Sequence, residues 1–154
     1  MPIPEFIVET RKKIGTDLMW VPSVCAVVLR DSTVDSPWAV PDVLLVRRAD
    51  NGQWTPVTGI VDPGEEPHVA AVREVLEETG VKVTAAAIVG VGSHGPVTHS
   101  NGDQASYMTV QLRCEPLDPT ADPVVGVPPP TGPLPLLRSF TPRWARGSRC
   151  LGSP

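Results

Sequence analysis

The chain has 154 residues, and its 13 Lys and Arg against 17 Asp and Glu give a formal net charge of −4. That length suits one domain with a substantial core, and the acidic balance argues against general nucleic-acid binding, which requires a basic face. The sequence holds no run of about 18 apolar residues and no secretory pattern, so no membrane association is expected. Three scattered cysteines without C-x-x-C spacing predict reduced thiols in a cytoplasmic protein and argue against zinc.

The first third of the chain alternates between a helical pattern and short apolar runs. Apolar residues recur at helical spacing over 3–14 and stop at Gly15, which predicts a first helix. The segments that follow are apolar runs bounded by turn-forming residues, and these predict strands. The predicted strands lie at 20–30, 43–47 and 54–61, with a loop at 31–42 and a turn at 50–52.

A second helix is predicted between Pro67 in its first turn and Gly80 at its C-terminus. At about 100° per residue, its larger apolar side chains form one stripe, which we expect to be buried. The stripe contains Val69, Val72, Leu76 and Thr79, with Val75 at its border. The acidic side chains fall on the opposite face, and we expect them to be exposed there, flanked by two alanines that leave room for a bulky ligand. These residues are Glu74, Glu77 and Glu78, with Ala70 and Ala71 beside them.

The three glutamates of this helix are crowded. Glu74, Glu77 and Glu78 stand at i, i+3 and i+4, and like charges at that spacing cost about 0.2–0.5 kcal/mol per pair. A hard divalent cation would offset the repulsion, because such ions prefer carboxylate oxygens. Arg73 lies beside the acidic face and can orient one carboxylate, with Glu65 of the preceding loop as a further partner. We therefore expect a cation site here.

The segment 59–81 resembles the signature of the Nudix hydrolases, G-x5-E-x7-R-E-U-x-E-E-x-G-U, where U is a bulky aliphatic residue. The signature positions are Gly59, Glu65, Arg73, Glu74, Val75, Glu77, Glu78, Gly80 and Val81, without insertion or substitution. A chance match would be on the order of one in a million at average residue usage, so a merely solvated acidic helix face is the weaker interpretation. One departure lies just outside the signature, where Thr58 stands in place of the second glycine that many members carry.

The resemblance implies an α+β protein with the Nudix fold, an α/β/α sandwich with a mixed β-sheet and a catalytic loop-helix. It also implies Mg²⁺, or Mn²⁺, held mainly by Glu77 and Glu78 with the carbonyl of Gly59. Glu74 is implied as a metal ligand or as the base that activates water, and Arg73 as the residue that holds a catalytic glutamate in place. Beyond the helix, apolar and alternating runs predict strands at 81–91 and 107–114.

Several residues outside the signature are candidates for substrate contact, namely Arg47, Arg48, Trp54 and Tyr107. The arginine pair ends a predicted strand and suits phosphates, although a solvated pair beside a turn fits equally well. The tryptophan can stack on a base, with core packing as the favoured interpretation. The tyrosine and Asp103 flank a loop that can shape a pocket. His94 and His99 lie within a Gly/Ser/Asn-rich stretch, 92–102, which we interpret as a mobile solvent-facing loop.

The composition changes abruptly after Asp122. We predict a domain over 1–122 and an atypical tail over 123–154 that has four arginines, many prolines and no acidic residue. The resemblance implies a further strand and a closing helix here, but neither periodicity survives past about Val125. Two explanations are open: a Pro-rich arm that wraps a partner subunit or stays mobile, or a shifted reading frame in a GC-rich gene.

Two functional hypotheses follow. The resemblance implies a metal-dependent pyrophosphohydrolase that cleaves a nucleoside diphosphate linked to another group and releases a nucleoside monophosphate. Its substrate would be a sugar nucleotide such as ADP-ribose or a noncanonical nucleoside triphosphate. The alternative is a non-catalytic nucleotide-binding module, as a damaged C-terminus would produce. The expected partner is a small nucleotide-diphosphate molecule, and homo-oligomers are expected through the N-terminal helix or the C-terminal tail.

Overall fold

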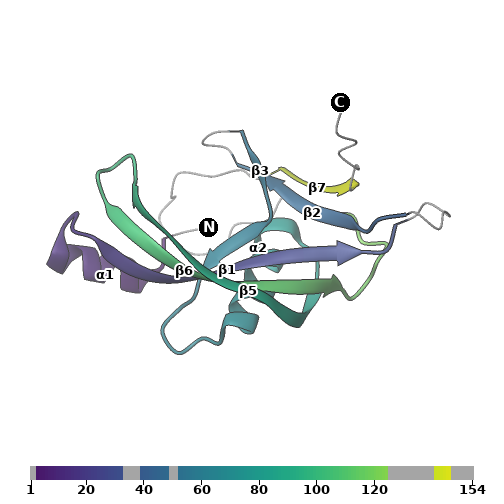
Figure 1. The fold of residues 1–154 in the computed structure, drawn as a ribbon, viewed down its shortest axis with the longest axis horizontal. Coiled ribbons are helices and arrows are strands. Elements are labelled where there is room, and N and C mark those ends of the chain that lie inside the picture. The colour runs from purple at the N-terminus through teal and green to yellow at the C-terminus, as the bar shows by residue number, and fades with distance from the viewer. Residues whose placement is uncertain (1–2, 33–38, 49–51, 125–140, 147–154) are drawn as a thin grey trace, which may run out of the picture.

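The computed structural model of the chain describes residues 3–32, 39–48, 52–124 and 141–146. Within these ranges the chain forms helices and strands in the order that Figure 1 shows. The elements are α1 (Glu5–Ile14), β1 (Met19–Arg30), β2 (Asp42–Arg47), β3 (Trp54–Thr55), β4 (Val57–Ile60), α2 (Pro67–Thr79), β5 (Val83–Thr98), β6 (Gln104–Pro116) and β7 (Thr141–Arg146). In this part of the chain, no helix has the length and apolar character needed to cross a membrane.

Strand β1 stands at the centre of the sheet. Along residues 19–28 it pairs in parallel with β6, and on its other side residues 23–26 pair antiparallel with β4 and residues 29–30 with β2. The path through the sheet is β3-β2-β1-β6-β5, with β4 added to β1 and β7 added to β2. The sheet is mixed, because β1 and β6 run parallel whereas the other recorded pairs are antiparallel.

The two helices pack on opposite faces of this sheet. Successive side chains of a strand point to opposite faces, so the even-numbered and odd-numbered residues of β1 enter different clusters. The main core lies under α2 and includes Val24, Ala26, Val28, Leu44, Val46, Val57, Ala70, Ala71, Val75 and Leu112. A smaller cluster joins Met19 and Val21 of β1 to Ile7 of α1. This layering confirms the predicted α+β fold with a mixed sheet.

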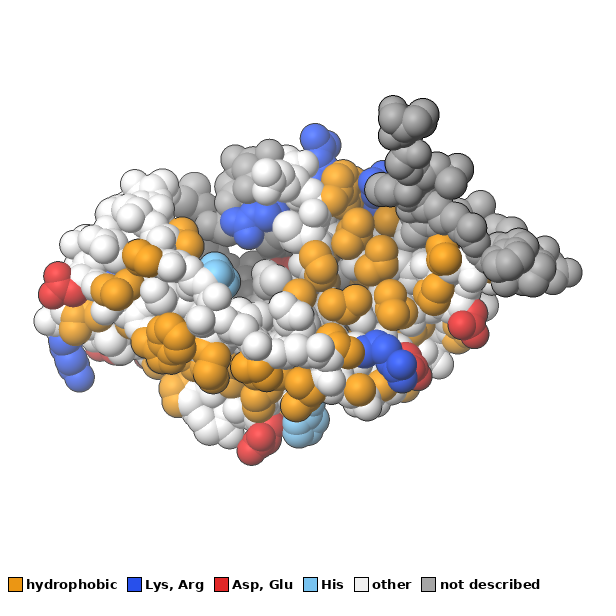
Figure 2. All heavy atoms as spheres, in the orientation of Figure 1, with side chains coloured by type: hydrophobic (Ala, Val, Ile, Leu, Met, Phe, Trp, Pro, Cys, Tyr) orange, Lys and Arg blue, Asp and Glu red, His pale blue; other side chains and the backbone are white. Residues whose placement is uncertain are grey.

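Much of the face turned away from α2 is not covered by a helix. Figure 2 views the molecule from that side, with α2 behind the sheet, and hydrophobic side chains gather there over the strands. α1 packs only at the end where β1 begins, beside the β5–β6 turn. Arg11 of α1 donates from Nη2 to the carbonyl of Gln104 at 2.7 Å, and its Nε lies 3.5 Å from Asp103. The helix therefore anchors one end of the sheet and leaves the rest open.

Most predicted elements are confirmed, with shifted boundaries. The predicted first helix and the strands at 20–30, 43–47 and 107–114 are present as α1, β1, β2 and β6. The segment 54–61 divides into β3 and β4 around Pro56, which cannot donate a backbone hydrogen bond to a neighbouring strand.

Two expectations about irregular segments were wrong. The strand predicted at 81–91 begins at Val83 and continues to Thr98, so most of the stretch expected to be a mobile loop is strand. Pairing with β6 along this length overrides the low strand propensity of its glycines and serine. In the tail, β7 pairs with β2 from Thr141 to Arg146, although the residue pattern indicated no strand there and only the resemblance implied one. The two explanations for the tail concern mainly residues 125–140 and 147–154, which lie outside the described residues.

Candidate functional site

Helix α2 carries the acidic residues, and its ends are set by local sequence. Pro67 occupies the first turn, where its missing N–H is not needed. Gly80 ends the helix in the left-handed conformation, with φ 70° and ψ −2°, and its N–H donates to the carbonyl of Leu76 at 2.9 Å. A glycine adopts that backbone conformation without the strain that a Cβ would introduce. The predicted helix boundaries are thus confirmed.

The face that α2 buries differs from the predicted one. Glu74 and Glu78 are only 1% and 6% exposed, whereas Val69 and Leu76 are 47% and 44% exposed. The residues that do face the core are Ala70, Ala71, Glu74, Val75, Glu78 and Thr79. Small alanine side chains allow the helix to approach the sheet closely, and this rotation carries two of the three glutamates inward. The expectation of an exposed acidic front was therefore wrong for Glu74 and Glu78 and holds for Glu77.

Gly59 of β4 is required by the position of Glu74. A Cβ placed on Gly59 would lie 2.2 Å from Cγ of Glu74 and 2.5 Å from its Oε1, far inside van der Waals contact. The neighbouring side chain in β1 is Val24, which pairs with Gly59 across the strands. The first glycine of the motif therefore leaves the space that the Glu74 side chain occupies.

Arg73 connects the loop before α2 to the helix. Its Nε and Nη2 donate to both oxygens of Glu65, at 2.9 and 2.8 Å, which is the bidentate geometry that favours an arginine over a lysine. Its Nη1 donates to Oε1 of Glu74 at 2.8 Å, and Nη2 also donates to the carbonyl of Ile60 at 3.1 Å. Glu77 stands further away, with its Oε2 3.7 Å from Nη1. One guanidinium thus fixes the loop, the strand end and the Glu74 carboxylate together.

The loop itself is held by the second contact of Glu65. Oε2 of Glu65 accepts a hydrogen bond from the backbone N–H of Asp62 at 3.1 Å. The hydrogen bond from Arg73 is the main cause that lowers the pKa of Glu65, so this carboxylate stays ionised. The predicted pairing of Arg73 with Glu65 is confirmed by this geometry.

The two buried carboxyl groups have perturbed proton affinities. Burial raises the pKa of Glu74 to about 7, although the charge of Arg73 acts in the opposite direction. Burial likewise raises the pKa of Glu78 to about 8, and the negative charge of Glu74 adds to that shift. Without a counter-ion, each carboxyl therefore retains its proton to a higher pH than an exposed glutamate would.

Two carboxylate oxygens at this site have no hydrogen-bond partner among the described residues: Oε2 of Glu74 and Oε2 of Glu78. Buried polar atoms are nearly always paired, so orphaned ones call for a partner such as an ion. Within the described ranges, no group of three or more His, Cys, Asp or Glu side chains is close enough to hold a metal ion. The site therefore fits an ion that takes one or two carboxylates and completes its shell with water and substrate phosphate, as Mg²⁺ does.

The structure separates the predicted arginine pair. The charge of Arg48 acts on Glu78 and lowers its pKa, a smaller effect than the burial that raises it. Arg47 instead donates from Nε to the carbonyl of Gly52 at 3.1 Å, within its own β2–β3 turn. Trp54, opposite Arg47 across the strands, has the guanidinium of Arg143 at 3.9 Å from its ring centre. Among the described residues, Arg47 and Trp54 contact the β2–β3 turn and β7 rather than the glutamates of α2.

Tyr107 is part of a ring cluster that the sequence did not predict. Its hydroxyl lies 2.8 Å from Nε2 of His99, and the His94 ring stacks on it at 5.0 Å with an interplanar angle of 14°. The cluster forms because β5 continues as a strand and places His94 opposite Tyr107. Asp103 is engaged elsewhere, with Arg11 and with the side chain of Asn101. The sequence would indicate this cluster only if 92–98 were predicted to be strand, because strand pairing is what places His94 opposite Tyr107.

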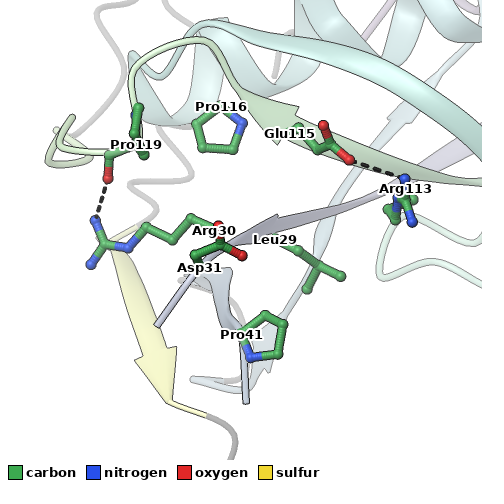
Figure 3. A pocket seen from close by; sticks show the side chains of 8 residues that line it. All are labelled: Leu29, Arg30, Asp31, Pro41, Arg113, Glu115, Pro116 and Pro119. Carbon is green, nitrogen blue, oxygen red and sulfur yellow. Dashed lines mark hydrogen bonds and ion pairs between the residues drawn. The ribbon is translucent and has the colours of Figure 1, made fainter. Parts of the chain in front are cut away.

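A separate cavity of about 370 Å³ opens at the C-terminal end of β1, where Leu29 and Arg30 lie. Figure 3 shows its lining side chains, among them Arg30, which donates to the carbonyl of Pro119 at 3.4 Å, and the Arg113–Glu115 ion pair at 3.0 Å. None of the motif residues lines it. The chemistry of the buried carboxylates, rather than the volume of this cavity, therefore locates the candidate site.

The fold and this carboxylate–arginine arrangement define a protein of the Nudix class. The NUDIX domain family matches residues 19–129, which is most of the chain and includes every motif residue. The chain belongs to the Nudix family.

Relatives and solved structures agree with this assignment. Over 49 residues the chain is 51% identical to a putative 8-oxo-dGTP diphosphatase of Bacillus subtilis (strain 168), which covers 32% of this chain and 33% of that protein. It is 43% identical over 49 residues to a MutT-like protein of Streptomyces ambofaciens, covering 32% of each. These matches span about a third of the curated relatives. The crystal structure of the MutT protein from Methanosarcina mazei Go1 superposes with a TM-score of 0.53 at 20% identity, over 83% of this chain and 78% of that one. At that identity the likeness supports the fold.

Proposed function

We propose that the protein is a metal-dependent pyrophosphohydrolase that cleaves a nucleoside diphosphate linked to another moiety and releases a nucleoside monophosphate. The observation that carries the proposal is the pair of buried carboxylates on α2, each with one oxygen that no described residue satisfies. Burying two acids side by side is unfavourable unless a cation compensates them. Membership of the Nudix family and the named diphosphatase relative support the same reaction class.

Glu78 and Glu77 are the proposed metal ligands, with the Gly59 carbonyl as an additional donor. Glu74 is the proposed base, or a ligand in place of one of these two, so that no more than two carboxylates bind the ion. Mg²⁺ or Mn²⁺ suits this all-oxygen set and, when bound, would neutralise charge on the phosphate oxygens and acidify a water molecule. Arg73 keeps Glu74 in one orientation through its 2.8 Å hydrogen bond. Glu74 can exchange a proton near neutral pH, since its pKa is about 7 in the ion-free chain.

For the substrate we propose a sugar nucleotide such as ADP-ribose or a noncanonical nucleoside triphosphate such as 8-oxo-dGTP. Arg48 is the proposed phosphate contact, because its charge acts on Glu78. The ring cluster of Tyr107 with His94 and His99 is a candidate surface for a nucleobase, since flat rings stack on one another.

The test is phosphate or monophosphate release from a panel of these nucleotides, with and without Mg²⁺. Glu77→Gln and Glu78→Gln should lose metal-dependent turnover, and Glu115→Gln, a half-exposed glutamate paired with Arg113, is the matched control that should keep it. Turnover that is unchanged in both motif variants would overturn the proposal. Nucleotide binding without any turnover by the parent chain would instead establish the non-catalytic binding module.

A further inference from the structure

The outer edge of β5 is an unusually open strand edge. β5 is the last strand on the path through the sheet, and among the described residues β6 is its only partner. Its 16 residues include no Asp, Glu, Lys or Arg, and its one proline, Pro96, lies beyond the stretch 90–94. Ile88, Val89 and Val91 are 65%, 57% and 63% exposed along it. Natural proteins normally protect such an edge with charges, prolines or a covering element, because its unpaired backbone groups attract another strand.

The opposite margin of the sheet shows the contrast. β7, which pairs with β2, has the sequence T-P-R-W-A-R and so carries Pro142 and Arg143. Proline removes a backbone donor and arginine adds a charge, and both discourage pairing with a further strand. β3 and β4 are only two and four residues long. β5 has a proline of its own, Pro96, and three irregular pairings, but these lie outside or at the ends of the stretch 90–94. Figure 1 shows β7 and β5 at opposite margins of the sheet.

We propose that β5 is the interface of a two-fold symmetric dimer, in which the β5 strands of two copies pair antiparallel and join the two sheets into one. Pairing is irregular at 85–87, 88–90 and 94–97, which leaves 90–94 as the uninterrupted stretch. A two-fold axis at Val91 would place Val91 beside its twin and Gly90 beside the twin's Gly92. Along an edge strand, every second residue directs its backbone N–H and C=O outward. Whether these are the odd-numbered or the even-numbered residues, the two-fold axis places them opposite the same residues of the second copy, so the two edges can form hydrogen bonds with each other.

The absence of charge on β5 favours a second copy as the occupant. With no charged side chain on β5, two copies bring no like charges together across the axis. His94 of one copy would stand six residues from its twin, roughly 20 Å along the strand. A Cβ on Gly92 would meet nothing within 4 Å, so among the described residues no side chain packs over that face of the strand. Val91 pairs with Val110 on the face that carries α2, and the twin's Val91 would cover its exposed methyl groups.

The pairing also limits the size of the assembly. Each copy offers one such edge, and the antiparallel pair consumes both, so the contact closes at two chains and cannot extend into a filament. This interface is distinct from the N-terminal helix and the C-terminal tail that the sequence suggested for association.

The test is the mass in solution, measured by light scattering across a dilution series of the full chain. The parent should have the mass of two chains at high concentration and dissociate on dilution. Val91→Lys should shift the mass to one chain, because two ammonium groups would meet at the axis, where directly opposed like charges are unfavourable. Val8→Lys, on the exposed side of α1 at 41% exposure, is the matched control and should remain a dimer.

A cysteine variant gives an independent readout that does not depend on disrupting the dimer. Directly opposed residues of an antiparallel pair have Cβ atoms about 4.5–5.5 Å apart, near the range that a disulfide spans. Under mild oxidation, Val91→Cys should cross-link into dimers beyond the parent level, and Leu117→Cys, which is also exposed, should not. A parent that is monomeric at all concentrations, larger oligomers, or a dimer that survives Val91→Lys without cross-linking of Val91→Cys would each overturn the proposal.

Discussion

At the residue scale, the most constrained position is Gly59. The Glu74 side chain occupies the space where any Cβ on residue 59 would lie, at 2.2 Å from Cγ. The glycine is required by close packing, since its φ is not in the left-handed range. Glu74 packs against this glycine and also accepts a hydrogen bond from Arg73. The positions of β4 and α2 therefore depend on each other through Glu74.

Gly59→Ala should therefore displace Glu74. We expect a loss of about 1–3 kcal/mol in the free energy of unfolding, as for other overpacked sites, and a large loss of metal-dependent turnover. Chemical denaturation and the nucleotide assay would measure the two effects. Gly92→Ala is the matched control, because its Cβ has open space and it lies far along β5. Equal behaviour of the two variants would show that the close contact between Gly59 and Glu74 is unimportant.

Arg73 provides a second residue-scale prediction. Arg73→Lys keeps the charge but loses the bidentate contact with Glu65 and cannot reach Glu74 and Ile60 at the same time. We expect kcat to fall by about 100-fold, which is typical when a reacting group is misplaced by about 1 Å, with little change in KM. Steady-state kinetics would show this split, and Arg113→Lys, in an exposed ion pair, should leave both constants unchanged. A change confined to KM would mean that Arg73 binds substrate rather than orienting Glu74.

At the element scale, the sequence pattern of α2 predicted the ends of the helix correctly but not the face that it buries. Its ends were predictable because Pro67 and Gly80 act through local backbone chemistry. Its rotation was not, because a count of bulky apolar residues favours the Val69–Leu76 stripe. The structure instead buries the alanines, which allow close approach to β4. Because Glu74 and Glu78 lie on the same face, they are buried as well. The motif selected these residues as candidates, and the sequence alone could not reveal which of them are buried.

The buried glutamates make the stability of the metal-free protein depend on pH. Glu74 and Glu78 have folded-state pKa values of about 7 and 8, above the ordinary value of 4.5 for an exposed glutamate. Between pH 4.5 and 8 the folded state therefore binds more protons than the unfolded state, so stability falls as pH rises. The effect is on the order of 3 kcal/mol for Glu74 at 1.36 kcal/mol per pKa unit. Glu65, with a lowered pKa, acts with the opposite sign but only below this window.

Calorimetry in a chelator should accordingly give a higher Tm at pH 5.5 than at pH 8. Mg²⁺ should raise Tm more at pH 8 than at pH 5.5, because only the ionised carboxylates bind it. Glu78→Gln should flatten the pH dependence, since the amide cannot ionise. A Tm that rises from pH 5.5 to pH 8 without metal would contradict the assigned burial of these groups.

At the scale of the whole molecule, the C-terminal segment is where sequence reasoning was least informative. The proline- and arginine-rich composition after Asp122 hides β7, whose partner β2 lies about a hundred residues earlier. Strand pairing over that separation leaves no local periodicity to read. The order of the elements and the motif were predictable from local patterns, whereas the placement of β7 depends on contacts between distant segments.

β7 is attached to the core through Trp144. Its ring packs against the main core, its Nε1 donates to the carbonyl of Ala121 at 3.1 Å, and the guanidinium of Arg30 lies 4.2 Å from the ring centre. Arg30 in turn pairs with the buried Asp42 at 3.3 Å. Trp144 therefore joins the tail to β1, to β2 and to the segment after β6.

If this strand belongs to the folded domain, removing its anchor should destabilise the whole sheet. We expect Trp144→Ala to lower the free energy of unfolding by about 2 kcal/mol, below the 3–5 kcal/mol of a fully buried aromatic because the ring is half-buried. Trp144→Phe should lose less, since it retains a ring under Arg30 and gives up only the hydrogen bond to Ala121. A chain that ends after Val124 should lose at least as much as Trp144→Ala, because β2 then lacks its outer partner as well. Urea unfolding of the three variants beside the parent measures this series, and equal midpoints throughout would place the end of the folded domain before β7.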